Sequence, residues 1–454
     1  MTRFYTSAAV GALLWALPAA ADTLSLNEVL ALAYETNPQL QGARAAVRAS
    51  DEGVAQANAG WRPSINASGT YGPESTKISG LGTLSSQQLS GQVVITEPIF
   101  RGGRTYAEIG RAKASVRAAR AQLTAAEQSI LLDAVTAYMN VVTDSATLKL
   151  RQTNVDVLER QRKETQEQFD VGELTRTDVA QSEARLAGAK SAFTTAQGQL
   201  AVDRATFEQV VGRPAETLED QPALPKLPIN EDVAVASAMT QNPSMVFASA
   251  NEKAADYAVD DALGALLPTV SIAGEYQYQK GGLNSLGLGG PQTVEQNLAV
   301  LGQVNVPIYQ GGAEEALVRQ AKAQHEQSQN DVMTADRQVH QAVASAWESY
   351  NSAKATITSL ESQVKANQIA FEGVQKEQQV GGRTTLDVLN AEEELLDSEV
   401  AVVAAQRNAA IAAYQLLAAE GGLTANNLGL AVTIYDPLEH YDSDAGRWIG
   451  LGGW

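Results

Sequence analysis

The sequence contains no cysteine and only three histidines among its 454 residues. The lack of cysteine excludes disulfide bonds, thiol catalysis, thiolate zinc sites and iron–sulfur clusters. With His325, His340 and His440 as the whole histidine complement, a histidine metal centre is not expected. Basic residues are scarce too, since 33 Lys and Arg oppose 52 Asp and Glu, for a net charge of −19. This balance argues against nucleic-acid binding, because affinity for phosphate needs a basic surface.

Aromatic residues make up 6% of a chain that is 44% hydrophobic, so small apolar side chains supply much of the apolar content. Such a composition favours thin, closely packed helices over a thick globular core. No apolar stretch after residue 22 is a candidate membrane-spanning helix. The chain is therefore expected to have no transmembrane helix.

The first 21 residues are typical of a secretory signal peptide. A short basic start (residues 1–3) precedes an apolar run (residues 8–17) and the small-residue sequence Pro-Ala-Ala-Ala at 18–21. The alternative is an N-terminal membrane anchor, but the run is shorter than the ~20 residues that a spanning helix needs. We therefore expect an exported protein, located in the periplasm, in the outer membrane or outside the cell.

Several sequence landmarks occur twice in the same order, which indicates an internal duplication. Asn37-Pro38 recurs at residues 242–243, displaced by 205 residues. Two longer motifs recur with a displacement of 209: PIFRGG at 98–103 as PIYQGG at 307–312, and VGELTRTDV at 171–179 as VGGRTTLDV at 380–388. The predicted organisation is a first repeat at 22–212, a linker at 213–230, a second repeat at 231–421 and a C-terminal tail at 422–454.

Each repeat is predicted to contain a β-hairpin, at 63–98 and at 268–307. A helix ends before each hairpin, after a break at Asn-Pro, where the Asn can cap the helix and the Pro can take its first position. Apolar and polar residues then alternate strictly, as in strands with one apolar face. We expect strands of about ten residues, joined by loops rich in Gly, Ser and Thr at 72–88 and 279–295.

Very long helices follow the hairpins, at 103–169 and 313–379, and shorter helices return at 175–211 and 384–420. Ile109, Val116, Leu123 and Ile130 recur every seven residues, which is typical of a coiled-coil seam. A 67-residue helix would be about 100 Å long. In the second repeat His325 falls in the seam, where a tolerated polar residue is a simpler interpretation than a metal ligand. His340 and His440 have no partners at ligand spacing.

Four strands with an apolar face match the ~9–11 residues that cross an outer membrane, but four strands cannot close a barrel. Because open strand edges are not tolerated in lipid, the chain is expected to oligomerise. Two copies would give eight strands with a filled interior, and three copies would give twelve strands around an aqueous lumen. The alternatives are a soluble fibrous scaffold with two hairpins and an exported hydrolase, for which no carboxylate spacing is apparent.

The motifs EPIFRGG at 97–103 and VPIYQGG at 306–312 resemble the strand-to-helix junction of the TolC-like outer-membrane efflux protein family. VGELTRTDV and VGGRTTLDV resemble the tips of the family's helical hairpins. The resemblance implies an α+β membrane protein: a homotrimer with a 12-stranded β-barrel in outer-membrane lipid, continued by a periplasmic α-helical barrel. The residues that match the junction are Pro98, Gly102, Gly103, Pro307, Gly311 and Gly312.

The resemblance also implies two kinds of site at the tips. Val171-Gly172 and Val380-Gly381 match the positions that dock a periplasmic adaptor. The tips of the second repeat match a gate that an Arg-centred network and rings of Asp hold closed. The matching gate positions are Arg383 and Asp387, with Thr177 and Asp178 as acceptors for the Arg, while Gln378 and Asn390 depart from the Tyr and second Asp of the family pattern.

Arg383 and Asp387 lie four residues apart, so a local ion pair on one helix is the alternative interpretation of these two residues. The function implied is passive export, since no phosphate-binding GxxxxGK[ST] or GxGxxG motif is present and no catalytic motif or cofactor is expected. Energy would come from an inner-membrane ABC transporter or proton-driven pump, joined by the adaptor. The start at 25–40 and the tail at 435–448 most resemble the branch that serves type I protein secretion, and drug or metal efflux is the alternative.

Overall fold

The computed structural model describes residues 23–79, 82–220, 222–281 and 293–450. The predicted signal peptide at 1–21 lies outside these residues. Within the described ranges, no helix is long and apolar enough to span a membrane. The elements are α1 (Leu26–Thr36), α2 (Pro38–Asn58), η1 (Ala59–Trp61), β1 (Ser64–Ile78), β2 (Gly82–Arg101), α3 (Arg104–Asp170), α4 (Arg176–Val211), α5 (Glu231–Gln241), α6 (Pro243–Gly264), β3 (Thr269–Gly281), β4 (Thr293–Asn305), α7 (Ala313–Gln379), α8 (Thr385–Glu420), α9 (Ala425–Leu428) and α10 (Glu439–Asp444).

The chain forms two compact units, and each unit draws on both predicted repeats. One unit comprises the described parts of Met1–Glu35, Asp133–Leu224 and Ala355–Ile411. We call it the helical unit. The other comprises the described parts of Thr36–Leu132, Pro225–Lys354 and Ala412–Trp454, and contains every strand. We call it the sheet unit. The packing units thus cut across the sequence repeats, because α3 and α7 each contribute to both.

Asn-Pro pairs start α2 and α6, as the sequence predicts. The side chain of Asn37 accepts a hydrogen bond from the N–H of Gln39 at 2.9 Å, and that of Asn242 accepts one from Ser244 at 2.9 Å. Each Asn is extended, with ψ of 121° and 126°, and a Pro follows at the first helical position. Both caps satisfy backbone donors that a helix start leaves without partners.

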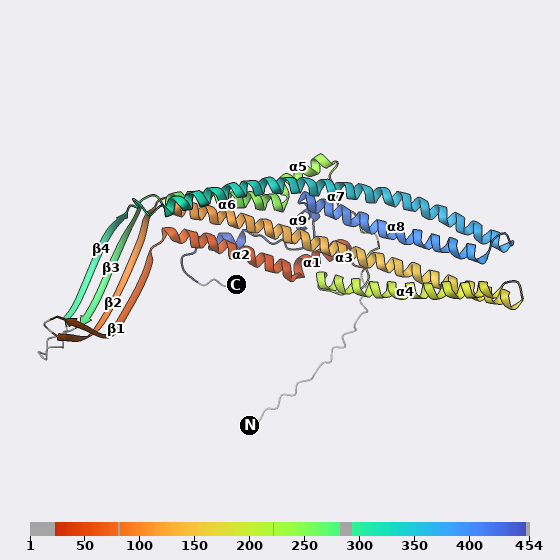
Figure 1. Cartoon of the computed structure of the whole chain (residues 1–454), viewed down its shortest axis with the longest axis horizontal. Coiled ribbons are helices and arrows are strands. Elements are labelled where there is room, and N and C mark those ends of the chain that lie inside the picture. Colours follow the sequence, from red (N-terminus) through yellow and green to blue (C-terminus); the bar gives the residue numbers. More distant parts are fainter. Residues whose placement is uncertain (1–22, 80–81, 221, 282–292, 451–454) are drawn as a thin grey trace, which may run out of the picture. The chain divides into compact units, whose positions relative to one another are not determined.

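The strands of the sheet unit form one antiparallel sheet in the order β1-β2-β3-β4 (Figure 1). The register aligns Val93 with Tyr276 and Tyr276 with Leu298. Residues paired across strands point to the same face, so the alternating apolar residues of all four strands share one face. That face is exposed, with Leu298 and Val300 at 76% and 73% of their full accessibility.

The strands are longer than the ten residues predicted. β1 and β2 have 15 and 20 residues, and β3 and β4 have 13 each. The prediction of a loop at 72–88 is wrong, because the ladder there continues from Pro73 opposite Gln87 to Ile78 opposite Gly82. Ladder hydrogen bonds join backbone groups, so a polar stretch that lacks an apolar alternation can still pair. In the second predicted loop, residues 282–292 lie outside the described residues.

Paired glycines make both strand-to-helix junctions. Gly102 and Gly103 have φ of 64° and 81°, and Gly311 and Gly312 have φ of 67° and 81°, a region that other residues rarely adopt. At Gly102 an added Cβ would also lie 2.2 Å from the backbone oxygen of Gly264. The first junction therefore requires glycine for its conformation and for its close packing against the end of α6.

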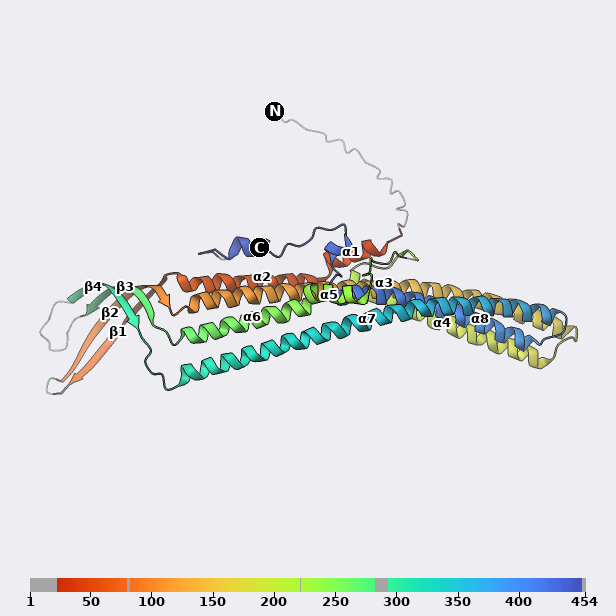
Figure 2. The same cartoon turned by 90° about the horizontal axis from the view of Figure 1, so that it is seen from above.

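Apolar side chains between the helices form the cores of the two units. In the helical unit Val155 and Leu158 of α3 pack with Leu186 of α4 and Leu389 of α8. In the sheet unit Ala234 and Ala238 of α5 pack with Val339 and Val343 of α7 and Leu416 of α8. Figures 1 and 2 both show α2 beside the first part of α3. The predicted seam is buried at Val116, Leu123 and Ile130.

Candidate functional site: the helical tips

The first tip joins α3 to α4 through a turn that closes on Gly172. This glycine has φ of 85°. Its N–H donates a hydrogen bond to the carbonyl of Phe169 at 2.9 Å, and the N–H of Glu173 donates one to the carbonyl of Gln168 at 2.9 Å. These hydrogen bonds satisfy carbonyl groups that have no partner at the end of α3, and they require a residue in the left-handed backbone conformation. Glycine at this position follows from the turn itself.

The second tip joins α7 to α8 with the same construction. Gly381 has φ of 77°, its N–H bonds the carbonyl of Gln378 at 2.9 Å, and the N–H of Gly382 bonds that of Glu377 at 2.8 Å. The two tips therefore share their backbone hydrogen bonds as well as their sequence pattern. Because the pattern VG recurs at both, each tip exposes a valine before its glycine.

The exposed surface of the tips is made of these small apolar residues. Val171 and Val380 are 73% and 83% accessible. An added Cβ on Gly172 or Gly381 would meet no atom within 4 Å. Backbone and valine side chains at both turns are thus open to a partner, which is the geometry that docking requires.

Asp178 and Asp387 both close capping boxes. Asp387 accepts hydrogen bonds from the N–H and the hydroxyl of Thr384 at 2.9 Å and 2.8 Å, and Asp178 accepts the equivalent bonds from Thr175 at 2.9 Å and 2.7 Å. The backbone and then the hydroxyl bond from Thr384 lower the pKa of Asp387, while the hydroxyl and then the backbone bond from Thr175 lower that of Asp178. Both carboxylates are therefore charged at neutral pH, as a capping box favours.

Arg383 pairs across its own turn. Its Nε lies 2.9 Å from Oε2 of Glu377, near the end of α7. Among the described residues, no ion pair joins Arg383 to Asp387 and no hydrogen bond joins it to Thr177 or Asp178. The local Arg383–Asp387 ion pair considered from the sequence does not form, and Arg383 pairs with Glu377 instead. Asp387 accepts its hydrogen bonds from Thr384 at the start of α8.

Asn390 accepts a hydrogen bond from Arg185, a residue that lies in no motif of the sequence. Nη2 of Arg185, on α4, donates to Oδ1 of Asn390 at 2.7 Å, and Nη1 of Arg185 pairs with Glu393. Arg185 lies seven residues after Asp178, so both occupy the same face of α4. That spacing is the signal by which Arg185 could have been recognised. The pairing links α4 directly to α8.

A groove of about 560 Å³ lies in the helical unit beside the second tip. Gln378 lines it, together with Asn154 and Arg160 of α3 and Glu392 of α8. Nδ2 of Asn154 donates to Oε1 of Glu392 at 3.3 Å, and burial raises the pKa of Glu392 to about 7. Glu392 is thus a buried acid near the second tip, and no motif of the sequence points to it beyond its place two residues after Asn390.

The three histidines have different surroundings. Nε2 of His325 lies 2.7 Å from Oε1 of Glu252, and His340 is exposed on α7. The prediction that His440 has no partners at ligand spacing is wrong, because His440 lies beside Asp444, four residues further along α10, and also beside Glu52 on α2. Glu52 is too distant in the sequence for any spacing rule to reveal this.

Comparison with known proteins agrees with the duplicated plan. The sequence model of a family described as "Outer membrane efflux protein" matches residues 29–213 and again residues 234–422. The chain belongs to the outer membrane efflux protein family. It is 35% identical over 433 residues to the outer membrane efflux protein BepC of Brucella suis, covering 95% of this chain and 93% of that protein.

Other members of the family are more distant. The outer membrane protein TolC of Vibrio cholerae is 24% identical over 420 residues, covering 91% of this chain and 94% of that protein. A crystal structure of CusC, described as forming a transmembrane channel, has a TM-score of 0.77 at 17% identity and covers 88% of this chain and 93% of that one. The predicted fold class of long helices plus β-hairpins in a duplicated unit is confirmed.

Family membership gives the location and the general activity. As an outer membrane efflux protein, the chain lies in the outer membrane. The family consists of non-enzymatic transport channels, in agreement with the expectation that the chain is not an enzyme. The roles of the tip, gate and junction residues stay predictions.

Proposed function

We propose that three copies of the chain form one passive export duct through the outer membrane. The observation that carries this proposal is the four-stranded sheet, which presents one continuous apolar face and ends at β1 on one side and β4 on the other. Edge strands cannot remain unpaired in lipid. Three copies, pairing β1 of one with β4 of the next, give twelve strands and leave an aqueous lumen.

The duct takes its driving force from partners. An inner-membrane transporter supplies the energy, and a periplasmic adaptor joins that transporter to the tips at Val171-Gly172 and Val380-Gly381. Support comes from the open valine side chains and uncovered glycine backbone at both turns. A helical hairpin of the adaptor with small apolar residues at its end would suit this surface, because close backbone approach needs small side chains.

The second tip serves as the gate of the duct. Arg383 and the three symmetry-related Asp387 carboxylates surround the opening of the duct at its tips, where it narrows. Rings of carboxylates favour cations in a pore, so one ring should give weaker cation selectivity than two. In the closed trimer Arg383 forms a bridge to a neighbouring helical hairpin. In the single chain its side chain pairs with Glu377 instead. Asn390 holds Arg185 where the family pattern has a second Asp.

We propose further that the duct serves type I secretion of a protein, with an ABC transporter as the energy source. The proteases secretion protein PrtF of Dickeya chrysanthemi supports this, at 28% identity over 272 residues, although the match covers only 54% of this chain and 55% of PrtF. The second candidate is an efflux duct for small molecules, favoured by the more extensive similarity to BepC, which is named for efflux.

Deletion of the gene separates the two functions. For type I secretion, one or more proteins disappear from the culture supernatant, while the inhibitory concentrations of dyes, detergents and antibiotics stay unchanged. For efflux, the secreted proteins should stay unchanged, while the inhibitory concentrations of dyes, detergents and antibiotics should fall. Purified protein in detergent should be a trimer by mass measurement and should form pores in planar bilayers. A stable, detergent-independent monomer would refute the duct altogether.

A further inference from the structure

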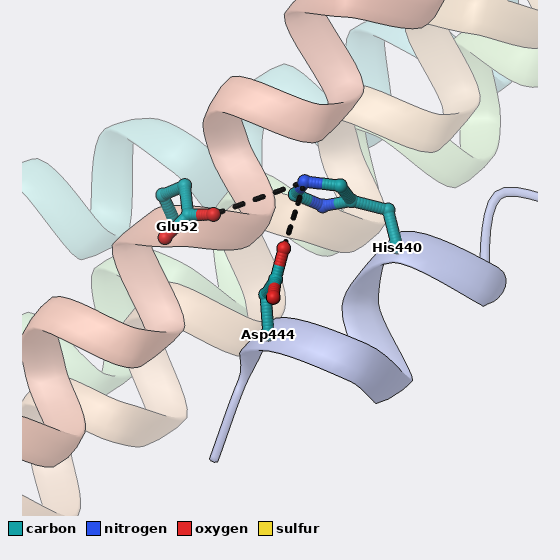
Figure 3. Close-up of side chains that lie close together, drawn as sticks. All are labelled: Glu52, His440 and Asp444. Atoms are coloured by element: carbon teal, nitrogen blue, oxygen red, sulfur yellow. Dashed lines mark ion pairs between the residues drawn. The ribbon is translucent and has the colours of Figure 1, made fainter. Parts of the chain in front are cut away.

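A cluster of metal-ligand atoms joins the C-terminal segment to α2 within the sheet unit. Figure 3 shows Glu52 of α2 and Asp444 of α10 both directed at the same ring nitrogen of His440. Nε2 of His440 lies 3.1 Å from Oδ2 of Asp444 and 3.8 Å from Oε1 of Glu52. The three donor atoms all lie within 4.8 Å of one another. One nitrogen and two oxygens are therefore close enough together to bind a single ion.

The spacing of the donors suits a small tetrahedral ion. With bonds of about 2.0 Å, the ligand atoms around zinc are about 3.3 Å apart. The separations of 3.1 Å and 3.8 Å bracket this value. Glu52 is exposed while Asp444 is buried, so the Glu52 side chain is free to close the longer distance. The exposed side also leaves a fourth position for water.

The other ring nitrogen of His440 faces a buried carboxylate. Nδ1 lies 3.5 Å from Oδ2 of Asp51, whose residue is 2% accessible. Neither carboxylate oxygen of Asp51 accepts a hydrogen bond, and Nδ1 of His440 makes none. A metal-bound histidine usually directs its second N–H to a carboxylate, which fixes the tautomer that leaves the other nitrogen free to bind the metal. Asp51 is placed for that role.

Cations around the cluster occupy positions that leave the converging atoms available. Arg120 approaches Oδ1 of Asp51 at 3.6 Å, and Arg447 binds Oδ1 of Asp444 at 2.7 Å. Oδ2 of Asp444 and Nε2 of His440 remain directed at each other. Asp51 and Asp444 thus each direct one oxygen to an arginine and the other toward His440.

We propose that Glu52, His440 and Asp444 bind one Zn²⁺ ion per chain, with Asp51 as the positioning residue for His440. Imidazole with carboxylates is a donor set that suits zinc, whereas magnesium and calcium prefer oxygen ligands only. The ion clasps α10 to α2. It adds to the bond from Asn58 to the carbonyl of Ala445 at 2.9 Å and the stacking of Arg62 on Trp448 at 4.9 Å.

The test is metal titration of the full-length protein in detergent after treatment with EDTA and dialysis. Calorimetry with Zn²⁺ should give one ion per chain, and Co²⁺ as a spectroscopic probe should show the intense visible bands of a four-coordinate site. His440→Gln and Asp444→Asn should each weaken Zn²⁺ binding at least tenfold. His340→Gln, an exposed histidine on α7, is the matched control and should bind as the wild type does.

The positioning role of Asp51 has its own readout. Asp51→Asn should weaken Zn²⁺ binding by about tenfold to a hundredfold, as loss of such a partner does, while the Co²⁺ bands still indicate four ligands. Hydrogen exchange in 439–447 should slow on addition of Zn²⁺ in the wild type and not in His440→Gln. Absence of Zn²⁺ binding, binding unchanged in His440→Gln, or equal competition by Mg²⁺ would overturn the site and leave an ion-pair cluster.

Discussion

Glu392 offers the sharpest test of the groove beside the second tip. Its residue is 7% accessible, its Oε2 has no hydrogen-bond partner, and Asn154 donates to its other oxygen at 3.3 Å. The substitution Glu392→Gln keeps the size and the acceptor for Asn154, and it removes the ionisable group. We expect the variant to be more stable than the wild type at pH 8 and equal to it at pH 5.

The size and sign follow from the pKa of Glu392. Burial raises it from 4.5 to about 7, a difference that corresponds to about 3 kcal/mol at 1.36 kcal/mol per pKa unit. Because the folded-state pKa is the higher one, the folded chain binds more protons in this range. The contribution of Glu392 to stability is therefore full below about pH 4.5 and is lost as the pH rises through about 7. Relaxation of the groove would reduce the effect to roughly 1–3 kcal/mol.

Hydrogen exchange of α8 amides near residue 392 is the measurement, made on the assembled protein in detergent at pH 5 and pH 8. Each 1.4 kcal/mol changes a local opening equilibrium about tenfold, so Glu392→Gln should increase protection by about tenfold to a hundredfold at pH 8. Glu394→Gln, an exposed neighbour, is the control and should have no effect. Protection that falls in Glu392→Gln at both pH values would show that the carboxylate has a favourable partner, and would refute the reasoning.

The remaining predictions concern docking and gating. Val380→Asp places a charge on an exposed residue next to the left-handed glycine, and it should abolish export while trimer yield stays normal. Gly172→Leu and Gly381→Leu should also abolish export, with added backbone strain because the φ angles there are 85° and 77°. Export at the wild-type rate in these variants would contradict the docking proposal. Arg383→Ser, alone and with Asp178→Ala, should raise single-channel conductance or sensitise cells to large antibiotics, because it loosens the closed end. Asp387→Asn should lower cation selectivity, because it removes one charge per chain from the ring of carboxylates. Equal behaviour of all the gate variants and the wild type in both assays would place the gate elsewhere.

Local features of the fold were predictable from the sequence because short-range physics determines them. Asn-Pro starts a helix at 37–38 and at 242–243, and in both places the Asn side chain accepts a hydrogen bond from the backbone N–H two residues later. The seven-residue spacing marked the long helices, and alternation marked the strands. Glycine pairs at 102–103 and 311–312 marked turns that need positive φ. The Thr-x-x-Asp boxes at 175–178 and 384–387 were also readable as caps, although the sequence analysis assigned their acids to the gate.

Tertiary structure decided the features that depend on contacts between distant segments. The length of β1 and β2 depended on backbone pairing in a polar stretch, where side chains carry no pattern. Arg185 reached Asn390, and His440 reached Glu52, only because the helices that bear them pack together. Likewise Glu392 acquired its raised pKa from burial beside α3. A sequence determines local backbone preferences directly, but the desolvation and the distances that tune a charged group arise only when remote helices meet.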